Sequence, residues 1–347
     1  MQMEKKINIF NKGDKIMLKH LKLFIIMLAV LALMMFSLSV NAEVVKWDLP
    51  TVWSATNYQS RCLKIFADEV KEATDGQVEI ILHYGGALGY KGPEMLSVVR
   101  DGLVPIGDVL KNAQTGEEKF FGITSLPFLA PGVVELRMLQ FFTRPVEDRI
   151  VEKHNQKILY QVPWPSRNVY TKKEISTLED LKGLKIRTVS KEDTDLFTLL
   201  GASPIQMPWG EVVTSLATGV IDGVATSSAS GVDGKFWEFT GYASRWNWHS
   251  SCDMVNVNLD AWNRLSPELQ KIIETKAREL EPQFWKLAVE ENKEKEKILI
   301  SEGIKVYDPN PELKKIFAKL SSQIWQDHMN EVPESIKVIE DYLAIME

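Results

Sequence analysis

The sequence reads D-L-K-G-L-K-I-R from Asp180 to Arg187, L-G-A-S-P-I-Q-M-P-W-G-E from Leu200 to Glu211, and L-A-T-G-V-I-D-G from Leu216 to Gly223. Arg187 ends a short strand-like run and is followed by helix signals. A tight Gly-Ala-Ser-Pro turn and a tryptophan beside a proline then precede a new strand. This order is typical of α/β units, in which ligand-binding groups lie at strand ends where loops gather in a crevice.

The segment before this stretch alternates between strand and helix signals. Strand-like runs are rich in β-branched residues, and the helical run between the first two has its apolar residues on one face. This alternation predicts a parallel sheet flanked by helices. The predicted elements are strands at 45–52, 78–83 and 103–110, with helices at 57–74 and 94–100 between them.

Proline and tryptophan mark the passage to a second unit. A helix at 133–142 and a strand at 157–162 are followed by Pro163-Trp164-Pro165, a stiff, extended segment at which we expect the chain to cross between domains. Later in the chain Ser266 and Pro267 predict the start of a long helix, which Pro282 should kink.

The N-terminus has the pattern of a secretory signal peptide. Six lysines precede the apolar run from Leu23 to Phe36, and small residues end at Val40-Asn41-Ala42. We therefore expect cleavage after Ala42 and a periplasmic protein, with a permanent membrane anchor as the alternative. Met17 is an alternative start, because two lysines would still precede the apolar run.

Charge and cysteine content narrow the function. The whole chain has 347 residues and a net charge of −6, and loss of residues 1–42, with six lysines and two acids, lowers that charge to about −10. Such an acidic protein repels nucleic acid and anionic lipid, so locally placed cations must hold any anionic ligand. Cys62 and Cys252, the two cysteines, can form one disulfide or remain as two free buried thiols.

Several motifs together resemble the DctP family, the solute receptors of tripartite ATP-independent periplasmic (TRAP) transporters. The resemblance spans nearly the whole mature chain. It rests on D-L-K-G-L-K-I-R, on F-A-D-E-V-K-E-A-T-D-G-Q-V-E-I from Phe66 to Ile80, on Gly85-Gly86-Ala87-Leu88-Gly89, on Leu126-Pro127-Phe128-Leu129, and on Glu211 with Gly219-Val220-Ile221-Asp222-Gly223.

The resemblance implies an α/β periplasmic binding protein fold with two lobes, each a sheet flanked by helices, and a long helix that links the lobes. We expect lobe I at 43–164 plus about 252–285, and lobe II at 165–251 plus about 286–347. It also implies hinge closure around a small organic anion, a carboxylate or a sulfonate, and delivery to a membrane permease. A monomer without cofactor is expected.

The same resemblance implies a set of ligand-binding residues. Arg187 matches the family's carboxylate clamp, and a guanidinium can grip a carboxylate with two parallel hydrogen bonds. Arg167 matches a second ligand-facing polar position, and Trp209 an aromatic position. A surface arginine or a core tryptophan is the alternative at each. Further residues expected at the mouth or in the partner lobe, with plain surface exposure or packing as the alternative, are Lys111, Asn112, Trp53, Asn57 and Tyr58.

The chain departs from the family pattern after Gly223. Many members carry an amide there, whereas this chain has Val224-Ala225-Thr226-Ser227-Ser228. We expect Thr226 and Ser227 to supply hydroxyl contacts, and Trp248 to stack on or enclose the ligand. The departures leave the ligand open among dicarboxylates, hydroxy or keto acids, aromatic acids and sulfonates.

Enzyme signatures are missing from the sequence. It contains no G-x-S-x-G, H-E-x-x-H, G-x-x-x-x-G-K-[ST] or C-x-x-C motif. A binding protein is therefore expected. Two alternatives remain, a ligand-sensing periplasmic subunit of a signalling system and a periplasmic enzyme that acts on an organic acid. Neighbouring genes would separate transport from sensing, and turnover of the bound compound would indicate an enzyme.

Overall fold

The structure, a computed structural model, describes residue 17, residues 19–27 and residues 44–346. Residues 17 and 19–27 are helical. The predicted cleavage position after Ala42 and the start at Met1 lie outside the described residues. None of the helices in the described part of the chain is both long enough and apolar enough to span a membrane.

One half of the unit formed by residues 45–347 contains two small sheets. The first sheet is a parallel pair, and the second has three antiparallel strands in the order β3-β10-β4. Helices α2 and α9 pack on these strands. The strands are β1 (Val45–Pro50), β2 (Val78–His83), β3 (Ile106–Leu110), β4 (Gln156–Pro163) and β10 (Cys252–Asn258), and the helices of this half are α2 (Tyr58–Ala73), α3 (Met95–Arg100), α4 (Val133–Lys153) and α8 (Leu259–Asn263).

The other half is a mixed six-stranded sheet in the order β11-β9-β5-β8-β6-β7. Strand β6 lies between two parallel neighbours, β7 and β8, whereas β5 is antiparallel to β8 and β9. The strands are β5 (Asn168–Thr171), β6 (Lys185–Thr188), β7 (Ser203–Gln206), β8 (Gly223–Thr226), β9 (Tyr242–Ser244) and β11 (Lys305–Tyr307), and the helices around them are α5 (Lys191–Leu199), α6 (Val212–Thr218) and α7 (Ser228–Asp233).

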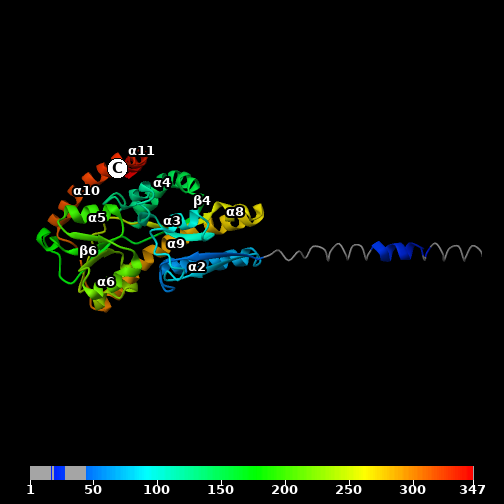
Figure 1. The fold of residues 1–347 in the computed structure, drawn as a ribbon, viewed down its shortest axis with the longest axis horizontal. Helices are drawn as coiled ribbons and strands as arrows, with labels where there is room; N and C mark the ends of the chain where they lie inside the picture. The colour runs from blue at the N-terminus through cyan, green and yellow to red at the C-terminus, as the bar shows by residue number, and fades with distance from the viewer. Residues whose placement is uncertain (1–16, 18, 28–43, 347) are drawn as a thin grey trace, which may run out of the picture. The chain divides into compact units, whose positions relative to one another are not determined.

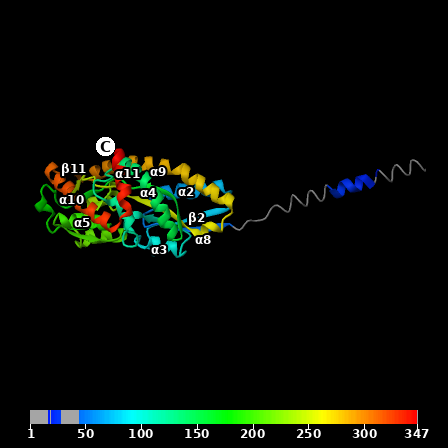
Figure 2. The same ribbon diagram turned by 90° about the horizontal axis from the view of Figure 1, so that it is seen from above.

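Helix α9 (Pro267–Ser301) extends from one half to the other. It packs against α2 and β4 in the first half and against α7 and β11 in the second. Figures 1 and 2 show α2, α3 and α8 toward one end of this unit and α5 and α10 toward the other. The last two helices, α10 (Pro311–Glu331) and α11 (Glu334–Met346), pack on α5 and α4 respectively.

The motif Gly219-Val220-Ile221-Asp222-Gly223 has a local physical explanation. Gly219 ends α6 in the left-handed conformation, with φ of 74°. A Cβ atom on Gly223 would lie 2.6 Å from the carbonyl oxygen of Tyr170 in the neighbouring strand. Both positions therefore require glycine, the first for its backbone conformation and the second for the close approach of β8 and β5.

The predicted fold class, an α/β fold whose sheets are flanked by helices and joined by a long helix, is confirmed. The prediction of one parallel sheet in the first half is wrong, because β10 returns from late in the sequence and pairs antiparallel with β3 and β4. The helix predicted at 133–142 continues to Lys153, since its buried face runs past Pro145 to Val146 and Ile150. The predicted lobe boundaries stay a prediction.

A buried ion pair fastens the first half. Lys111 lies in the short 3-10 helix η1 (Lys111–Ala113), and its Nζ is 2.8 Å from Oε1 of Glu147 on α4. Both side chains are excluded from solvent. Gln161 donates a hydrogen bond to the other oxygen of Glu147. Burial works to raise the pKa of Glu147, but the charge of Lys111 and these hydrogen bonds lower it below its ordinary value.

We predict that Lys111→Met destabilises the protein by about 3–5 kcal/mol, because it leaves the Glu147 carboxylate buried without a counterion. Urea unfolding measures this loss. The matched double variant Lys111→Met/Glu147→Gln removes both charges while keeping an acceptor for Gln161, so it should recover most of the stability. If the free energy of unfolding of Lys111→Met were within about 1 kcal/mol of that of the wild type, the stabilising role of the ion pair would be contradicted.

Candidate functional site

The candidate site is a cavity between the six-stranded sheet and the sheets of the first half. It has an inner part and a wider outer part of about 370 Å³, which share Trp53, Leu110, Arg187, Val189 and Trp209. Both halves of the unit therefore contribute to its walls. The inner part is also lined by Trp164, Pro165, Arg167, Thr226, Ser227, Ser230 and Ser251, and the outer part by residues that include Lys91, Asp108, Ala113, Gln206 and Met207.

Arg187 is held by a neutral acceptor. It lies on β6, and its Nε and Nη2 atoms donate to the carbonyl oxygen of Met207 at 3.1 and 3.0 Å. The side chain is only 3% exposed, and among the described residues no carboxylate forms an ion pair with it. Burial, followed by the positive charge of Arg167, lowers the pKa of Arg187 to about 9. The guanidinium is thus charged at neutral pH, fixed in orientation, and left with N–H groups to donate.

Arg167 is the second buried cation at the cavity. It directly precedes β5, and its Nη1 donates to the carbonyl oxygen of Ala225 at 3.4 Å. Its Nε lies 3.6 Å from Oδ2 of Asp193 and makes no hydrogen bond within the part of the chain that the structure describes. Burial lowers the pKa of Arg167, and the charge of Asp193 opposes this effect.

Asp193 supports Arg167 from behind. It lies in the first turn of α5, which Ser190 caps, and its side chain is fully buried. Its Oδ1 accepts from Nε1 of Trp248 at 2.9 Å and from Nε2 of His249 at 2.8 Å. Burial works to raise the pKa of Asp193, but His249, Arg167 and these hydrogen bonds lower it far below its ordinary value. Burial lowers the pKa of His249, so at neutral pH its imidazole is uncharged.

Three tryptophans form an aromatic wall of the cavity. Trp53 follows β1, Trp164 follows β4, and Trp209 begins the 3-10 helix η4 (Trp209–Glu211). The ring centroid of Trp53 lies 4.6 Å from that of Trp164 and 5.9 Å from that of Trp209. Asp253 on β10 fixes two of the rings, because its two oxygens accept from Nε1 of Trp53 and of Trp164, each at 2.8 Å.

Asp108 and Asp253 form a buried carboxyl pair behind this wall. They lie on the adjacent strands β3 and β10, and Asp108 also accepts from the hydroxyl of Thr51 at 2.6 Å. Burial and the charge of Asp108 raise the pKa of Asp253 well above its ordinary value. Burial raises the pKa of Asp108 to about 6, against hydrogen bonds from Thr51, Asp253 and Trp53. Neutral pH lies above the pKa of Asp108, so Asp108 carries a negative charge there, beside the carboxyl group of Asp253.

The structure brings part of the predicted residue set together. Six of the predicted residues line the cavity. Two arginines, two hydroxyl-bearing residues and one tryptophan come from the six-stranded half, and a second tryptophan comes from the other half. These six residues come from five separate stretches of sequence that meet at strand ends, as the sequence predicted. The predicted residues found there are Arg187, Arg167, Trp209, Trp53, Thr226 and Ser227.

Lys111 and Asn112 lie outside the cavity, contrary to expectation. The ion pair with Glu147 directs the Lys111 side chain into the first half, so it adds no positive charge to the site. Asn112 is fully buried, and within the described residues its amide atoms have no hydrogen-bond partner. The neighbouring residues Leu110 and Ala113 line the cavity instead.

Asn57, Tyr58 and Trp248 are also packed away from the cavity. Asn57 caps α2 through Gln59 N and donates to the carboxylate of Asp233. Tyr58 is fully buried and donates to the carbonyl oxygen of Pro163. Trp248 supports Asp193, so its role in the site is indirect.

Sequence reasoning missed the groups that position the others. Trp164 carried a signal, because it lies between two prolines, but those prolines were interpreted only as a crossing. Asp193 looks like an ordinary first-turn acid of a helix, and Asp253 like a polar residue in a strand. The tryptophan and histidine side chains that hydrogen-bond to them lie 55 or more residues away in the sequence. Cys62 and Cys252, both among the described residues, are buried and free, which answers the question of a disulfide.

The described residues contain no group of three or more histidine, cysteine or acidic side chains arranged to hold a metal ion. The site is instead built for a negatively charged ligand. It combines two buried guanidiniums, hydroxyl groups and an aromatic wall, which suit a small anion with a compact, partly apolar body.

Comparison with known proteins agrees with this geometry. The model of the family described as "Bacterial extracellular solute-binding protein, family 7" (DctP) matches residues 49–332. The chain is similar to a Bordetella pertussis extracytoplasmic solute receptor that binds pyroglutamic acid, with 31% identity, a TM-score of 0.84, and coverage of 86% of this chain and 99% of that one. A marine metagenome TRAP solute-binding protein specific for pyroglutamate has 29% identity and a TM-score of 0.83. The match covers 86% of this chain and 98% of that one.

A sequence relative extends the similarity to another solute. The 2,3-diketo-L-gulonate-binding periplasmic protein YiaO of Escherichia coli is 29% identical over 69% of this chain and 73% of its own length. A solute-binding protein of Chromohalobacter salexigens is 24% identical over 89% of this chain and 92% of its own length.

We predict that Asp108 makes the stability of the protein fall as the pH rises from about 4 to 7. Its pKa is about 6 in the folded protein and about 3.9 in the unfolded chain, so the folded state holds a proton that the unfolded state has lost. The stabilisation is complete below pH 4 and is lost as the pH passes 6, an effect of about 2–3 kcal/mol.

Urea unfolding of the wild type and Asp108→Asn at pH 4, 5, 6 and 7 measures this effect. The stability of the variant relative to the wild type should increase with pH. The exposed residue Asp68 offers a matched control, Asp68→Asn, whose relative stability should change little. Parallel pH profiles for the wild type and Asp108→Asn would contradict the assignment.

Proposed function

The chain belongs to family 7 of the bacterial extracellular solute-binding proteins, the DctP family, and from this premise we propose that it captures a small organic acid by an arginine clamp and delivers it to a TRAP membrane permease. The relatives are receptors, and we take this chain likewise to be a binding protein and not an enzyme. Arg187 receives the ligand carboxylate, and Arg167 lies beside it as the second cation.

A single observation carries the proposal. Arg187 is a buried guanidinium whose orienting partner is a neutral carbonyl oxygen, and no carboxylate of the described residues forms an ion pair with it. Burying an unpaired charge is unfavourable, and a ligand carboxylate would relieve this at the place where the N–H groups are already oriented. The lowered pKa of Arg187 has the same cause, which is burial together with the repulsion of Arg167.

The arrangement of the walls supports binding coupled to closure. Trp53 and Trp164 come from one half and the two arginines from the other, so a ligand that contacts both favours their approach. The link across the mouth between Lys91 and Glu211, at 3.0 Å, joins two exposed side chains. Such a pair contributes little stability and would open readily. Closure would also exclude water and strengthen each charge contact.

We propose pyroglutamate as the first compound to test. The receptors that bind it are 28–31% identical to this chain over nearly their whole length. A small ring with one carboxylate would also suit the tryptophan wall and the hydroxyls of Thr226 and Ser227. Hydroxy and keto acids, aromatic acids, dicarboxylates and sulfonates complete the set of compounds for calorimetry, and mass spectrometry of co-purified ligand gives an independent identification.

We further propose that the protein acts in the periplasm after cleavage behind Ala42. The support is the basic and apolar leader and the extracellular location of the family. The intact mass of protein recovered from the periplasm should correspond to a chain that begins at Glu43. A mass that retains the leader would contradict this.

We predict that Arg187→Ala weakens binding of the native ligand by roughly 10² to 10³-fold or more, since removal of one side of a buried ion pair costs about 3–5 kcal/mol. Arg187→Lys should also bind weakly, because a point charge cannot reproduce a two-pronged hydrogen bond. Isothermal titration calorimetry measures both.

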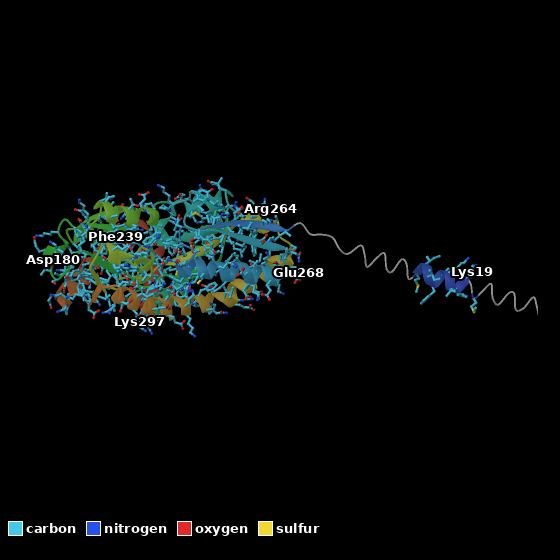
Figure 3. All side chains as sticks on the ribbon, turned by 90° about the horizontal axis from the view of Figure 1, so that it is seen from below. Lys19, Asp180, Phe239, Arg264, Glu268 and Lys297 are labelled. Carbon is cyan, nitrogen blue, oxygen red and sulfur yellow. The ribbon has the colours of Figure 1, made fainter. Side chains whose placement is uncertain are left out.

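Arg264→Ala is the matched control, because Arg264 is exposed. It lies at the opposite end of the unit from Asp180, which shortly precedes the strand that carries Arg187 (Figure 3). It should bind like the wild type. If Arg187→Ala bound within about threefold of the wild type, the clamp assignment would be wrong. If no organic acid bound the wild-type protein, the proposed function would fail.

A further inference from the structure

We infer that Asp193 sets the charge that the cavity accepts, so that the site selects singly charged carboxylates over doubly charged ones. This inference rests on the proposed function and adds a specificity-determining residue to it. Asp193 acts through Arg167 and lies behind it, so it is a positioning residue that the ligand need not touch.

The first step is the charge at the inner part of the cavity. Arg167 and Arg187 both line it, and each is at least nine-tenths buried. Their mutual repulsion contributes to the lowered pKa of Arg187. Asp193 is the acidic side chain that forms an ion pair with either of them among the described residues, through Nε of Arg167 at 3.6 Å. Two positive charges and one negative charge leave a single positive charge for the ligand.

Second, other titratable groups near Arg167 and Asp193 do not alter the net charge at the inner part of the cavity. His249, which donates to Asp193, is uncharged at neutral pH because burial lowers its pKa. Lys111 is neutralised by Glu147 within the first half. Glu192, next to Asp193 in α5, is buried, and burial raises its pKa to about 7. It lines a separate pocket together with His328 and Glu331 and does not line this cavity, so it is not part of the charge balance there.

The third step concerns the outer part of the cavity. Asp108 lines this part and carries one negative charge at neutral pH. A second carboxylate on a ligand held by Arg187 would therefore meet an acid there. Lys91 also lines the outer part, but its ammonium group pairs with Glu211. A doubly charged ligand would leave one negative charge buried without a counterion, which is strongly unfavourable.

The geometry also explains why an acid is needed at position 193. With Oδ1 fixed by Trp248 and His249, the carboxylate is held in place while its other oxygen, Oδ2, faces Arg167 and makes no hydrogen bond among the described residues. This oxygen offers charge to Arg167 without occupying the N–H groups that a ligand would use. Asparagine at this position would keep an acceptor for the two donors and would remove only the charge.

The experiment measures selectivity by calorimetry at pH 7 with two matched pairs of probes. Pyroglutamate and lactate carry one charge, whereas glutarate and malate carry two. Pyroglutamate is paired with glutarate, and lactate with malate. In the pair whose monoanion binds the wild type more tightly, we expect that monoanion to bind at least 30-fold more tightly than the dianion. Asp193→Asn should reduce this preference at least tenfold. Asp195→Asn removes a half-buried acid from the same helix, where it pairs with Lys191, and should leave the preference within about twofold.

Each outcome decides between the possibilities. If Asp193→Asn weakened binding of the monoanion and of the dianion by the same factor, the role of Asp193 would be merely structural and the inference would be overturned. The wild-type measurement needs no variant, so a dianion that binds the wild type as tightly as its matched monoanion would also overturn it, even if Asp193→Asn fails to fold. In both cases carboxylates still bind, and the proposed function stands. If no probe or other organic acid binds the wild type, the proposed function fails and the inference falls with it.

Discussion

The hydrogen bonds from Arg187 to the carbonyl oxygen of Met207 are the constraint on which the rest of the site depends. They exist because β6 and β7 run parallel with Thr188 opposite Gln206, which places Met207 just beyond the strand end. A carbonyl oxygen orients the guanidinium but cannot neutralise it. The fold therefore holds a buried positive charge in one orientation without an ion-pair partner among the described residues, and in the proposed function the ligand supplies that partner.

Around this cation, the network divides into groups that contact the cavity and groups that hold them. Asp193 holds Arg167 and is itself fixed by Trp248 and His249, whereas Asp253 holds Trp53 and Trp164. In each case a carboxyl group is buried behind the residues that line the cavity, and it accepts two hydrogen bonds in place of water. Side chains held in this way lose little further freedom when a ligand binds, so more of the contact energy contributes to affinity.

The sequence was informative wherever function depends on local backbone geometry. The strand that contains Arg187, the glycines at 219 and 223, and the loop around Trp209 all lie within one continuous stretch, and all were predicted. It was uninformative where a role depends on a distant partner. Nothing near Lys111 indicates that Glu147, 36 residues away, will take its charge, and nothing near Trp53 points to Asp253, 200 residues away. The return of the chain to lobe I at about residue 252 was expected, but the antiparallel pairing of β10 with β3 and β4 was not, since strand pairing across the chain leaves no local signal.

The burial of two arginines near one carboxylate also bears on how a receptor can report that it is occupied. Without ligand, bringing the tryptophan wall over Arg187 would remove water from a charge that has no counterion, so closure is disfavoured. With a carboxylate bound, the same movement buries a neutral pair and adds apolar contacts with Trp53 and Trp164. The difference between these two free energies is what a ligand can contribute to the conformational equilibrium. In the proposed function, the incomplete charge balance at Arg187 is therefore what makes the closed form depend on the ligand.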